Sequence, residues 1–288
     1  MTAETKYRFL FIQPFRISTT SEYLTWTVEG TREERLMNYD NLGLGRLLED
    51  VEWEIHPGPQ APYGDWPVEN REEFAMVAAA RLPIVREAAE SGNWNALILL
   101  GGGEPGADAA REIGRKHRIP VTSCATSQMH VASMLGNKFS VIDLADSHSM
   151  YYYNVIVQAR MSDRCASIRT IDYPLGRPGQ EDENSLAADK AKALAGEKTG
   201  GVEAAVAAAA AAIEEDGAEV ITFGCSGTFW LQPFVKEGLL ELGWDVPVLE
   251  GYSTAITQAK LMVSLGVDAS SLLFPGDRPA RIRERKIF

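Results

Sequence analysis

The chain has 288 residues, of which 45% are hydrophobic, and its 28 basic and 40 acidic residues give a formal net charge of −12. This is enough sequence for one large or two medium domains with a proper core, and the negative charge disfavours a nucleic acid or an anionic membrane as partner. Three cysteines are too few for a disulfide framework in so long a chain, so free thiols are expected.

No apolar run approaches the length that spans a bilayer, and residues 1–6 lack the basic and then apolar pattern of a signal peptide. The sequence therefore predicts a cytoplasmic protein with no membrane partner. We expect a small-molecule ligand and a homo-oligomer.

Apolar runs alternate with helical patterns along the first half of the chain. The runs at residues 8–15 and 95–100 are typical of parallel strands buried on both faces, and residues 51–55 alternate like a half-buried strand. Helices are predicted at residues 42–48, 72–91 and 107–117, with a bend or break of the second at Pro83. Residues 56–67 hold four prolines and are predicted to form a loop.

A glycine-rich loop, Gly101-Gly-Gly-Glu-Pro-Gly106, directly follows the strand at residues 95–100. The order of strand, glycine loop and helix resembles a turn whose backbone amides bind an anion. The Lys and Ser/Thr of a nucleotide P-loop are absent, and the spacing is not GxGxxG. A tight turn that needs glycine for steric reasons alone explains the loop equally well.

The second half of the chain repeats the alternation. Strands are predicted at residues 138–143, 220–223 and 246–249, with a short alternating stretch at 165–171. Helices are predicted at 129–135, 230–242 and 254–265, and an alanine-rich helical region at 185–213 is interrupted at Gly196 and Gly200. Residues 175–184 and the tail after Phe274 are expected to be exposed and polar.

This alternation predicts an α/β protein whose parallel sheets are covered by helices on both faces. Two such units fit the chain length. We place the first at residues 1–122 plus 250–288 and the second at residues 123–249.

Two of the predicted strands end at a cysteine surrounded by small polar residues. Cys124 follows residues 119–123 and Cys225 follows residues 220–223. At the start of a helix, unpaired amides lower the pKa of a thiol and favour a reactive thiolate. Because ligands collect beyond the carboxyl ends of parallel strands, two facing units would place the two thiols on opposite walls of one crevice. Cys165 lacks this setting and is interpreted as an ordinary buried thiol.

Motifs along most of the chain carry a family resemblance. They include Leu100-Gly-Gly-Gly-Glu-Pro-Gly106, Met129-His-Val-Ala-Ser-Met-Leu-Gly136, Phe223-Gly-Cys-Ser-Gly227 and Val246-Pro-Val-Leu-Glu-Gly251. On these motifs the chain resembles the aspartate/glutamate/hydantoin racemase superfamily, and within it the hydantoin and allantoin racemases. The resemblance implies two pseudo-symmetric α/β domains, an active site in the cleft between them, and neither a metal nor another cofactor.

The resemblance also implies the roles of individual residues. Cys124 and Cys225 fall on the two catalytic positions, where one thiolate removes the proton from the stereocentre and the other thiol donates a proton to the opposite face. The residues expected to bind the substrate are Gln13, Gly103, Thr126, Ser127, Ser226, Gly227 and Thr228. The chain is longer than the usual racemase through enlarged segments around residues 22–35 and 176–184.

The sequence therefore predicts a cofactor-independent racemase or epimerase of a hydantoin-like or other α-substituted carbonyl compound. Two alternatives stay open: a decarboxylase or maleate-type isomerase of the same fold, and a non-catalytic protein that binds a small anion. No His/Cys/Asp spacing fits a metal site. His130, His148 and the aromatic run at residues 151–153 are more simply explained as packing residues.

Overall fold

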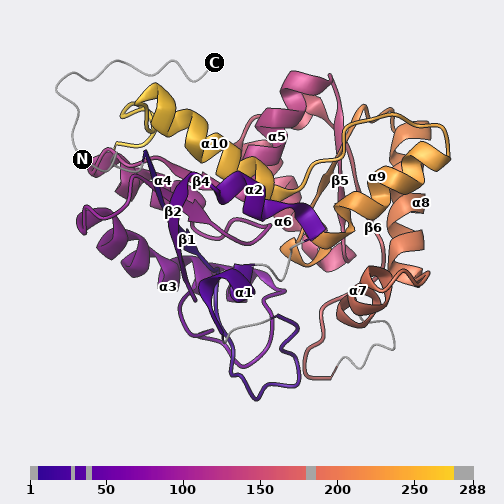
Figure 1. The fold of residues 1–288 in the computed structure, drawn as a ribbon, viewed down its shortest axis with the longest axis horizontal. Coiled ribbons are helices and arrows are strands. Elements are labelled where there is room, and N and C mark those ends of the chain that lie inside the picture. The colour runs from indigo at the N-terminus through magenta and orange to yellow at the C-terminus, as the bar shows by residue number, and fades with distance from the viewer. Residues whose placement is uncertain (1–5, 27–29, 37–40, 180–185, 276–288) are drawn as a thin grey trace.

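The computed structural model describes residues 6–26, 30–36, 41–179 and 186–275, and its strands form two parallel sheets (Figure 1). The first sheet has the order β2-β1-β3-β4 and the second the order β6-β5-β7. All strand pairs are parallel, so the predicted α/β class is confirmed. The strands are β1 (Tyr7–Ile12), β2 (Val51–His56), β3 (Ala96–Leu99), β4 (Val121–Ser123), β5 (Phe139–Asp143), β6 (Cys165–Thr170) and β7 (Val220–Phe223).

Helices cover both sheets and connect the parallel strands, as parallel connections require. The helices of the first half are α1 (Arg32–Leu36), α2 (Leu44–Leu48), α3 (Arg71–Glu90), α4 (Ala107–Lys116) and α5 (Cys124–Leu135). Those of the second half are α6 (Asp146–Gln158), α7 (Leu186–Leu194), α8 (Gly200–Glu214), α9 (Gln232–Glu241) and α10 (Gly251–Leu265), with short 3₁₀ turns η2 (Ser162–Arg164) and η3 (Ser226–Leu231).

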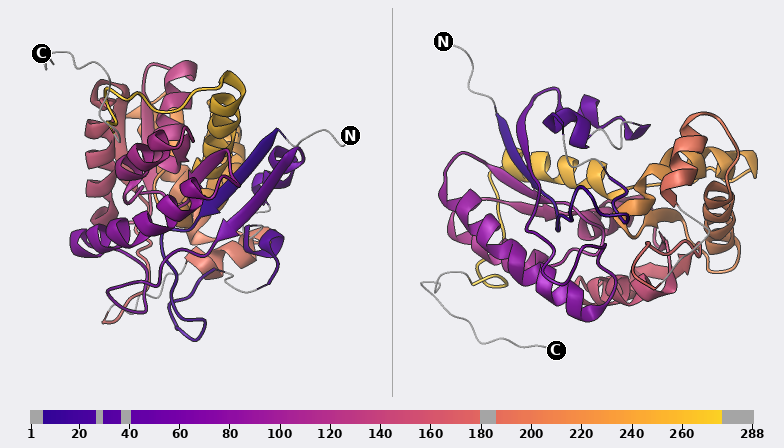
Figure 2. Two further views of the ribbon diagram at one scale, coloured as in Figure 1. Left: turned by 90° about the vertical axis from the view of Figure 1, so that its left-hand side faces the viewer. Right: turned by 90° about the horizontal axis from the view of Figure 1, so that it is seen from below.

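The helix α10 returns to the first sheet after the second sheet is complete. It packs against α5, β3 and β4, and Figures 1 and 2 show it in yellow beside the indigo and purple elements of the first half. Its residues Ala255, Ile256 and Ala259 are fully buried in this contact. The boundary predicted between residues 122 and 123 falls inside β4, and the domain limits otherwise stay a prediction.

One hydrophobic cluster joins the two sheets. It includes Phe11 and Ile98 of the first sheet and Ile142 and Phe223 of the second. Burial of a side chain of this size contributes about 1.5–3 kcal/mol before the entropy of ordering it is subtracted. The fully buried alanines of α8 let this helix lie close to β5 and β6, as the alanine-rich sequence predicts.

Several boundaries differ from the prediction. The helix α3 runs unbroken through Pro83, and the side chains of Asn70 and Glu73 form a capping box at its start. The predicted strand at residues 246–249 is reduced to a single bridge between Ile221 and Val248. Of the predicted loop 175–184, residues 180–184 lie outside the described residues, and so does the tail after residue 275. Within the described residues, no helix is both long and apolar enough to cross a membrane.

Candidate active site

Cys225 lies in a tight loop between β7 and η3. Its backbone N–H donates to Oδ1 of Asp143 at 2.9 Å, and Thr228 donates to its carbonyl through both the backbone N–H and Oγ1, at 2.9 and 2.6 Å. The Gly227 N–H donates to the Cys225 Sγ at 3.5 Å. Fixed in this way at the carboxyl end of β7, the thiol has a defined position and one amide donor.

A cavity of about 520 Å³, called here the Cys225 cavity, opens beside this loop. Its walls come from segments that follow strands of both sheets: residues 13–15 after β1, residues 101–103 after β3, and residues 225–227 after β7. Of the predicted site residues, Gln13, Gly103, Cys225, Ser226 and Gly227 line it. A volume of this size accommodates a small organic ligand.

Contacts between the two halves of the chain border this cavity. The rings of Phe74 in α3 and Tyr151 in α6 stack with centroids 3.8 Å apart, and the Tyr151 hydroxyl donates to the Glu69 carbonyl at 2.7 Å. Arg177, from the loop after β6, forms ion pairs with Glu69 at 3.0 Å and with Glu73 at 2.8 Å. These contacts hold the two halves together beside the ligand space.

Cys124 has a different setting. It is the first residue of α5, is fully buried, and its Sγ lies 3.6 Å from the carbonyl oxygen of Leu99 at the end of β3. A side chain at Gly251 would come within 2.5 Å of the Cys124 Cβ, so α10 seals the thiol from the other side. Cys124 is not among the residues that line the Cys225 cavity. The start of the glycine loop, two residues after Leu99, does line this cavity.

The other predicted binding residues outside the cavity lining all have internal partners. Ser127 Oγ donates to Gln258 at 2.5 Å, and Thr228 Oγ1 bonds to the Cys225 carbonyl. Thr126 bonds to Glu104 through its backbone N–H at 2.7 Å and through Oγ1 at 3.0 Å. Their roles toward a substrate stay a prediction, because the structure shows them supporting the loops that carry the thiols.

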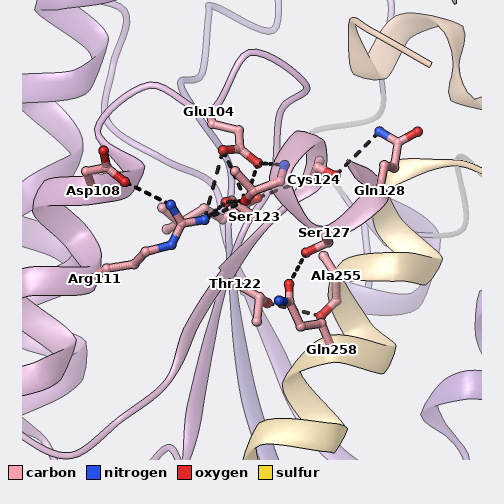
Figure 3. Close-up of polar contacts among 12 residues, drawn as sticks. Glu104, Asp108, Arg111, Thr122, Ser123, Cys124, Ser127, Gln128, Ala255 and Gln258 are labelled. Carbon is pink, nitrogen blue, oxygen red and sulfur yellow. Dashed lines mark hydrogen bonds and ion pairs between the residues drawn. The ribbon is translucent and has the colours of Figure 1, made fainter. Parts of the chain in front are cut away.

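The Glu104 carboxylate occupies the start of α5 (Figure 3). Glu104 is buried, has a left-handed backbone with φ of 55°, and faces Arg111, which also donates to Ser123 and Thr126. A carboxylate at a helix N-terminus is stabilised by the free amides. Here it accepts the Thr126 N–H, one of the amides expected to favour a thiolate at Cys124.

The predicted lowering of the two thiol pKa values is therefore wrong for this structure. Burial raises the pKa of Cys124 well above its usual value, and the charges of Glu104 and Glu250 raise it further. Burial, followed by the carboxylate of Asp143, raises the pKa of Cys225 to about 12, although the Gly227 amide acts in the opposite direction. Desolvation outweighs the helix-end amides at both sites, so both side chains are neutral thiols near pH 7.

Three buried polar atoms near Cys225 have no hydrogen-bond partner among the described residues: Asp143 Oδ2, His148 Nε2 and the Tyr152 hydroxyl. His148 and Tyr152 line the Cys225 cavity. Burial, followed by the charge of Asp143, raises the pKa of Tyr152, so its hydroxyl stays protonated and is free to donate. Buried polar groups rarely lack partners, which identifies these atoms as candidates for ligand contact.

Sequence reasoning missed Tyr152 and His148, which we had interpreted as packing residues. The available signal was their position, because α6 begins three residues after the carboxyl end of β5. Gly102 completes this arrangement: a Cβ there would lie 2.1 Å from the Tyr152 hydroxyl and 2.8 Å from the Cys225 Cα. The steric explanation of the glycine loop therefore holds at Gly102.

Within the described ranges, no group of three or more His, Cys, Asp or Glu residues is placed to hold a metal ion. The site has the parts of a proton-transfer centre: a thiol, a phenol without a partner among the described residues, and several loop amides next to one cavity. Such a centre, at the carboxyl ends of parallel strands in a two-sheet α/β fold, defines a class of acid–base enzymes.

The sequence profile of the Asp/Glu/hydantoin racemase family matches residues 50–259. The chain belongs to this family, which confirms the resemblance and the predicted isomerase of the racemase type. It is 26% identical over 203 residues to a hydantoin racemase of Paenarthrobacter aurescens, which covers 70% of this chain and 76% of the relative. It is 30% identical over 178 residues to a hydantoin racemase of Pseudomonas sp. (strain NS671), which covers 62% of each.

Solved structures share the fold. An allantoin racemase from Klebsiella pneumoniae superposes with a TM-score of 0.67 at 23% identity, over 97% of both chains. A form of arylmalonate decarboxylase in which a glycine is replaced by cysteine superposes with a TM-score of 0.53 at 15% identity, over 93% of this chain and 99% of that one. At these identities the likeness concerns the fold.

Proposed function

We propose that this chain is a cofactor-independent racemase or epimerase of a hydantoin-like or other α-substituted carbonyl compound, with Cys225 exchanging the proton at the stereocentre. The observation that carries the proposal is the position of Cys225, the one of the three thiols that lines the cavity. The two relatives named as hydantoin racemases support the class of substrate. The homo-oligomeric state and the cytoplasmic location stay predictions.

The chemistry suits a carbon acid next to a carbonyl group. In a hydantoin the ring carbonyl delocalises the carbanion, and no carboxylate opposes the charge. A thiol with a raised pKa is a proton donor at rest, and its thiolate, once formed, is a correspondingly stronger base. Because racemisation is reversible, one group serves as acid for one hand of the substrate and as base for the other.

The negative oxygen that develops on the substrate needs donors already in place. In our proposal the Tyr152 hydroxyl supplies one, since it is protonated, belongs to a residue that lines the cavity and has no partner among the described residues. Ser226 and Gln13 line the same space, and the Ser226 backbone amide and the Gln13 side chain complete the donor set in our proposal.

The identity of the second acid or base stays a prediction. The sequence assigns it to Cys124, whose thiol contacts the Leu99 carbonyl and is not among the residues that line the cavity. In our proposal Cys124 meets a substrate only if residues 101–103 move. Cys225 needs no such movement.

The presence of a single thiol in the cavity favours a second reaction for the same site. A disubstituted malonate would lose carbon dioxide, and its enolate would take one proton from Cys225, so one thiol is sufficient. The fold likeness to an arylmalonate decarboxylase is compatible with this reaction.

Both reactions are tested with the purified protein in deuterium oxide. A single enantiomer of 5-benzylhydantoin should lose optical rotation while deuterium enters C5 of the product, and EDTA should leave the rate unchanged. Carbon dioxide released from 2-methyl-2-phenylmalonate, without exchange in the hydantoin, would instead establish the decarboxylase. If neither compound reacts while both bind, the protein is a binding protein and the proposal is wrong.

A further inference from the structure

The Cys225 cavity has a charge opposite to that of the protein as a whole. The chain carries a formal net charge of −12, yet the cavity is lined by two cationic side chains, Arg35 and Lys190, and one carboxylate, Glu22. A locally positive cleft in an acidic protein raises the local concentration of anions. This arrangement is not needed for a neutral hydantoin ring.

Arg35 is one of these two cavity-lining cations. Its side chain lines the cavity, its Nε is sealed from solvent without a hydrogen-bond partner, and it forms no ion pair with any acidic residue of the described ranges. Buried guanidinium donors are normally satisfied, and their planar donor set matches a carboxylate. The Arg35 side chain lines the space where a ligand is expected and is therefore a candidate to bind an anionic group.

Arg32, on the same helix, shows the contrasting case. Its Nε bonds to Glu33 at 2.7 Å, its Nη1 lies 3.5 Å from Glu54 and donates to the Trp53 carbonyl, and its guanidinium stacks 4.7 Å from the Trp53 ring. Arg32 does not line the cavity. Arg32 is thus held by protein groups, whereas Arg35, one turn further along the same helix, lines the cavity.

We propose that Arg35 binds a carboxylate at the end of the substrate's α-substituent, so that the preferred substrate is an acidic one. This inference rests on the proposed function, because it assigns the substituent of the same α-substituted carbonyl compound. Arg35 lies in the segment around residues 22–35 that the family resemblance predicts to be enlarged, and Trp26 of this segment also lines the cavity. Arg35 therefore sets specificity, while Cys225 performs the proton transfer.

The test compares two hydantoins of nearly equal shape, 5-(2-carboxyethyl)hydantoin and its neutral amide 5-(2-carbamoylethyl)hydantoin. With the unmodified protein, KM for the acid should be about tenfold or more below KM for the amide, as a charge-assisted bidentate contact implies. In Arg35→Gln the KM for the acid should rise about tenfold, while kcat and the KM for the amide change less than about twofold. Arg35→Lys should retain part of the preference for the acid.

The matched control is Arg32→Gln, which should leave the preference for the acid unchanged, and circular dichroism checks that every variant is folded. An unchanged acid-to-amide ratio in Arg35→Gln would overturn the inference. If neither hydantoin exchanges its C5 proton, the proposed function fails. The role of Arg35 is then tested by calorimetry, which compares the affinities of the acid and the amide for the unmodified protein and for Arg35→Gln. Loss of the acid preference in Arg35→Gln would support the role of Arg35, and equal or absent binding of both compounds to the unmodified protein would contradict it.

Discussion

The loops that carry Cys124 and Cys225 have the same local sequence plan and different surroundings. Both follow a short parallel strand, and both cysteines are next to small residues. Cys225 lines a cavity and accepts an amide hydrogen from Gly227, whereas Cys124 is fully buried against the Leu99 carbonyl. A cysteine at the end of a parallel strand is therefore not by itself a reactive thiol.

The different surroundings of Cys124 and Cys225 come from residues that are distant in the sequence. Glu104 accepts the Thr126 amide at the start of α5, and the absence of a side chain at Gly251 lets α10 approach the Cys124 Cβ closely. Around Cys225 the distant partner is Asp143, which fixes the backbone of the loop and leaves the thiol facing the cavity. Four variants test how far the contrast extends to function.

The largest effect is expected for Cys225→Ala. Removing a positioned acid or base typically costs between about 10² and 10⁴ in rate, so we expect kcat for deuterium entry at the α-carbon to fall about 10³-fold. The control is Cys165→Ala, because this thiol lies in β6 and is not among the cavity-lining residues. A Cys225→Ala variant that keeps more than about a tenth of the activity would contradict the assignment.

The next largest effect is expected for Glu104→Ala, measured as the free energy of unfolding in urea. The change leaves the buried N–H of Thr126 without its acceptor and Arg111 without its buried carboxylate, which should cost about 2–4 kcal/mol. Alanine also has a Cβ, so the cost of the left-handed backbone is the same in both proteins. Asp108→Ala removes the exposed carboxylate that pairs with the same arginine, and it should cost less than about 1 kcal/mol.

A smaller effect is expected for Asp143→Asn on the reactivity of Cys225. The Asp143 charge raises the thiol pKa, so its removal lowers that pKa and increases the thiolate fraction at a given pH. Alkylation of Cys225 by iodoacetamide at pH 8, followed by mass spectrometry, should become about tenfold faster, equivalent to a shift of about one pKa unit. Asparagine keeps an oxygen that accepts the Cys225 N–H, so the loop stays in place. Asp146→Asn is the control, and equal alkylation rates in all three proteins would refute the role of Asp143.

The smallest effect is expected for Cys124→Ala. If Cys124 only fills space beside Leu99, kcat should fall less than about tenfold, and the main change should be a modest loss of stability from the missing sulfur atom. A loss as large as that of Cys225→Ala would show that the glycine loop opens and that the two-thiol mechanism predicted from the sequence is correct.

Local patterns in the sequence predicted the α/β class, most strands and the position of Cys225 at the end of a strand, where it lines a cavity, because each depends on hydrophobic periodicity or on the order of strand, loop and helix. The thiol pKa values could not be predicted in this way. They depend on burial and on Glu104 and Asp143, whose charges reach the thiols through the tertiary fold. Tyr152 was missed for a similar reason, since an aromatic run at the start of a helix gives no sign of which ring faces a cavity.

The return of α10 to the first sheet has a consequence for synthesis on the ribosome. The strands of the first sheet emerge early, but the helix that covers β3 and β4 is translated only after the whole second sheet. The nascent chain therefore carries an uncovered apolar surface for much of its elongation, and such surfaces are the ones that chaperones bind. The contacts of α10 with β3 and β4 join residues far apart in the sequence. We therefore expect the docking of α10 to be the slow step in refolding.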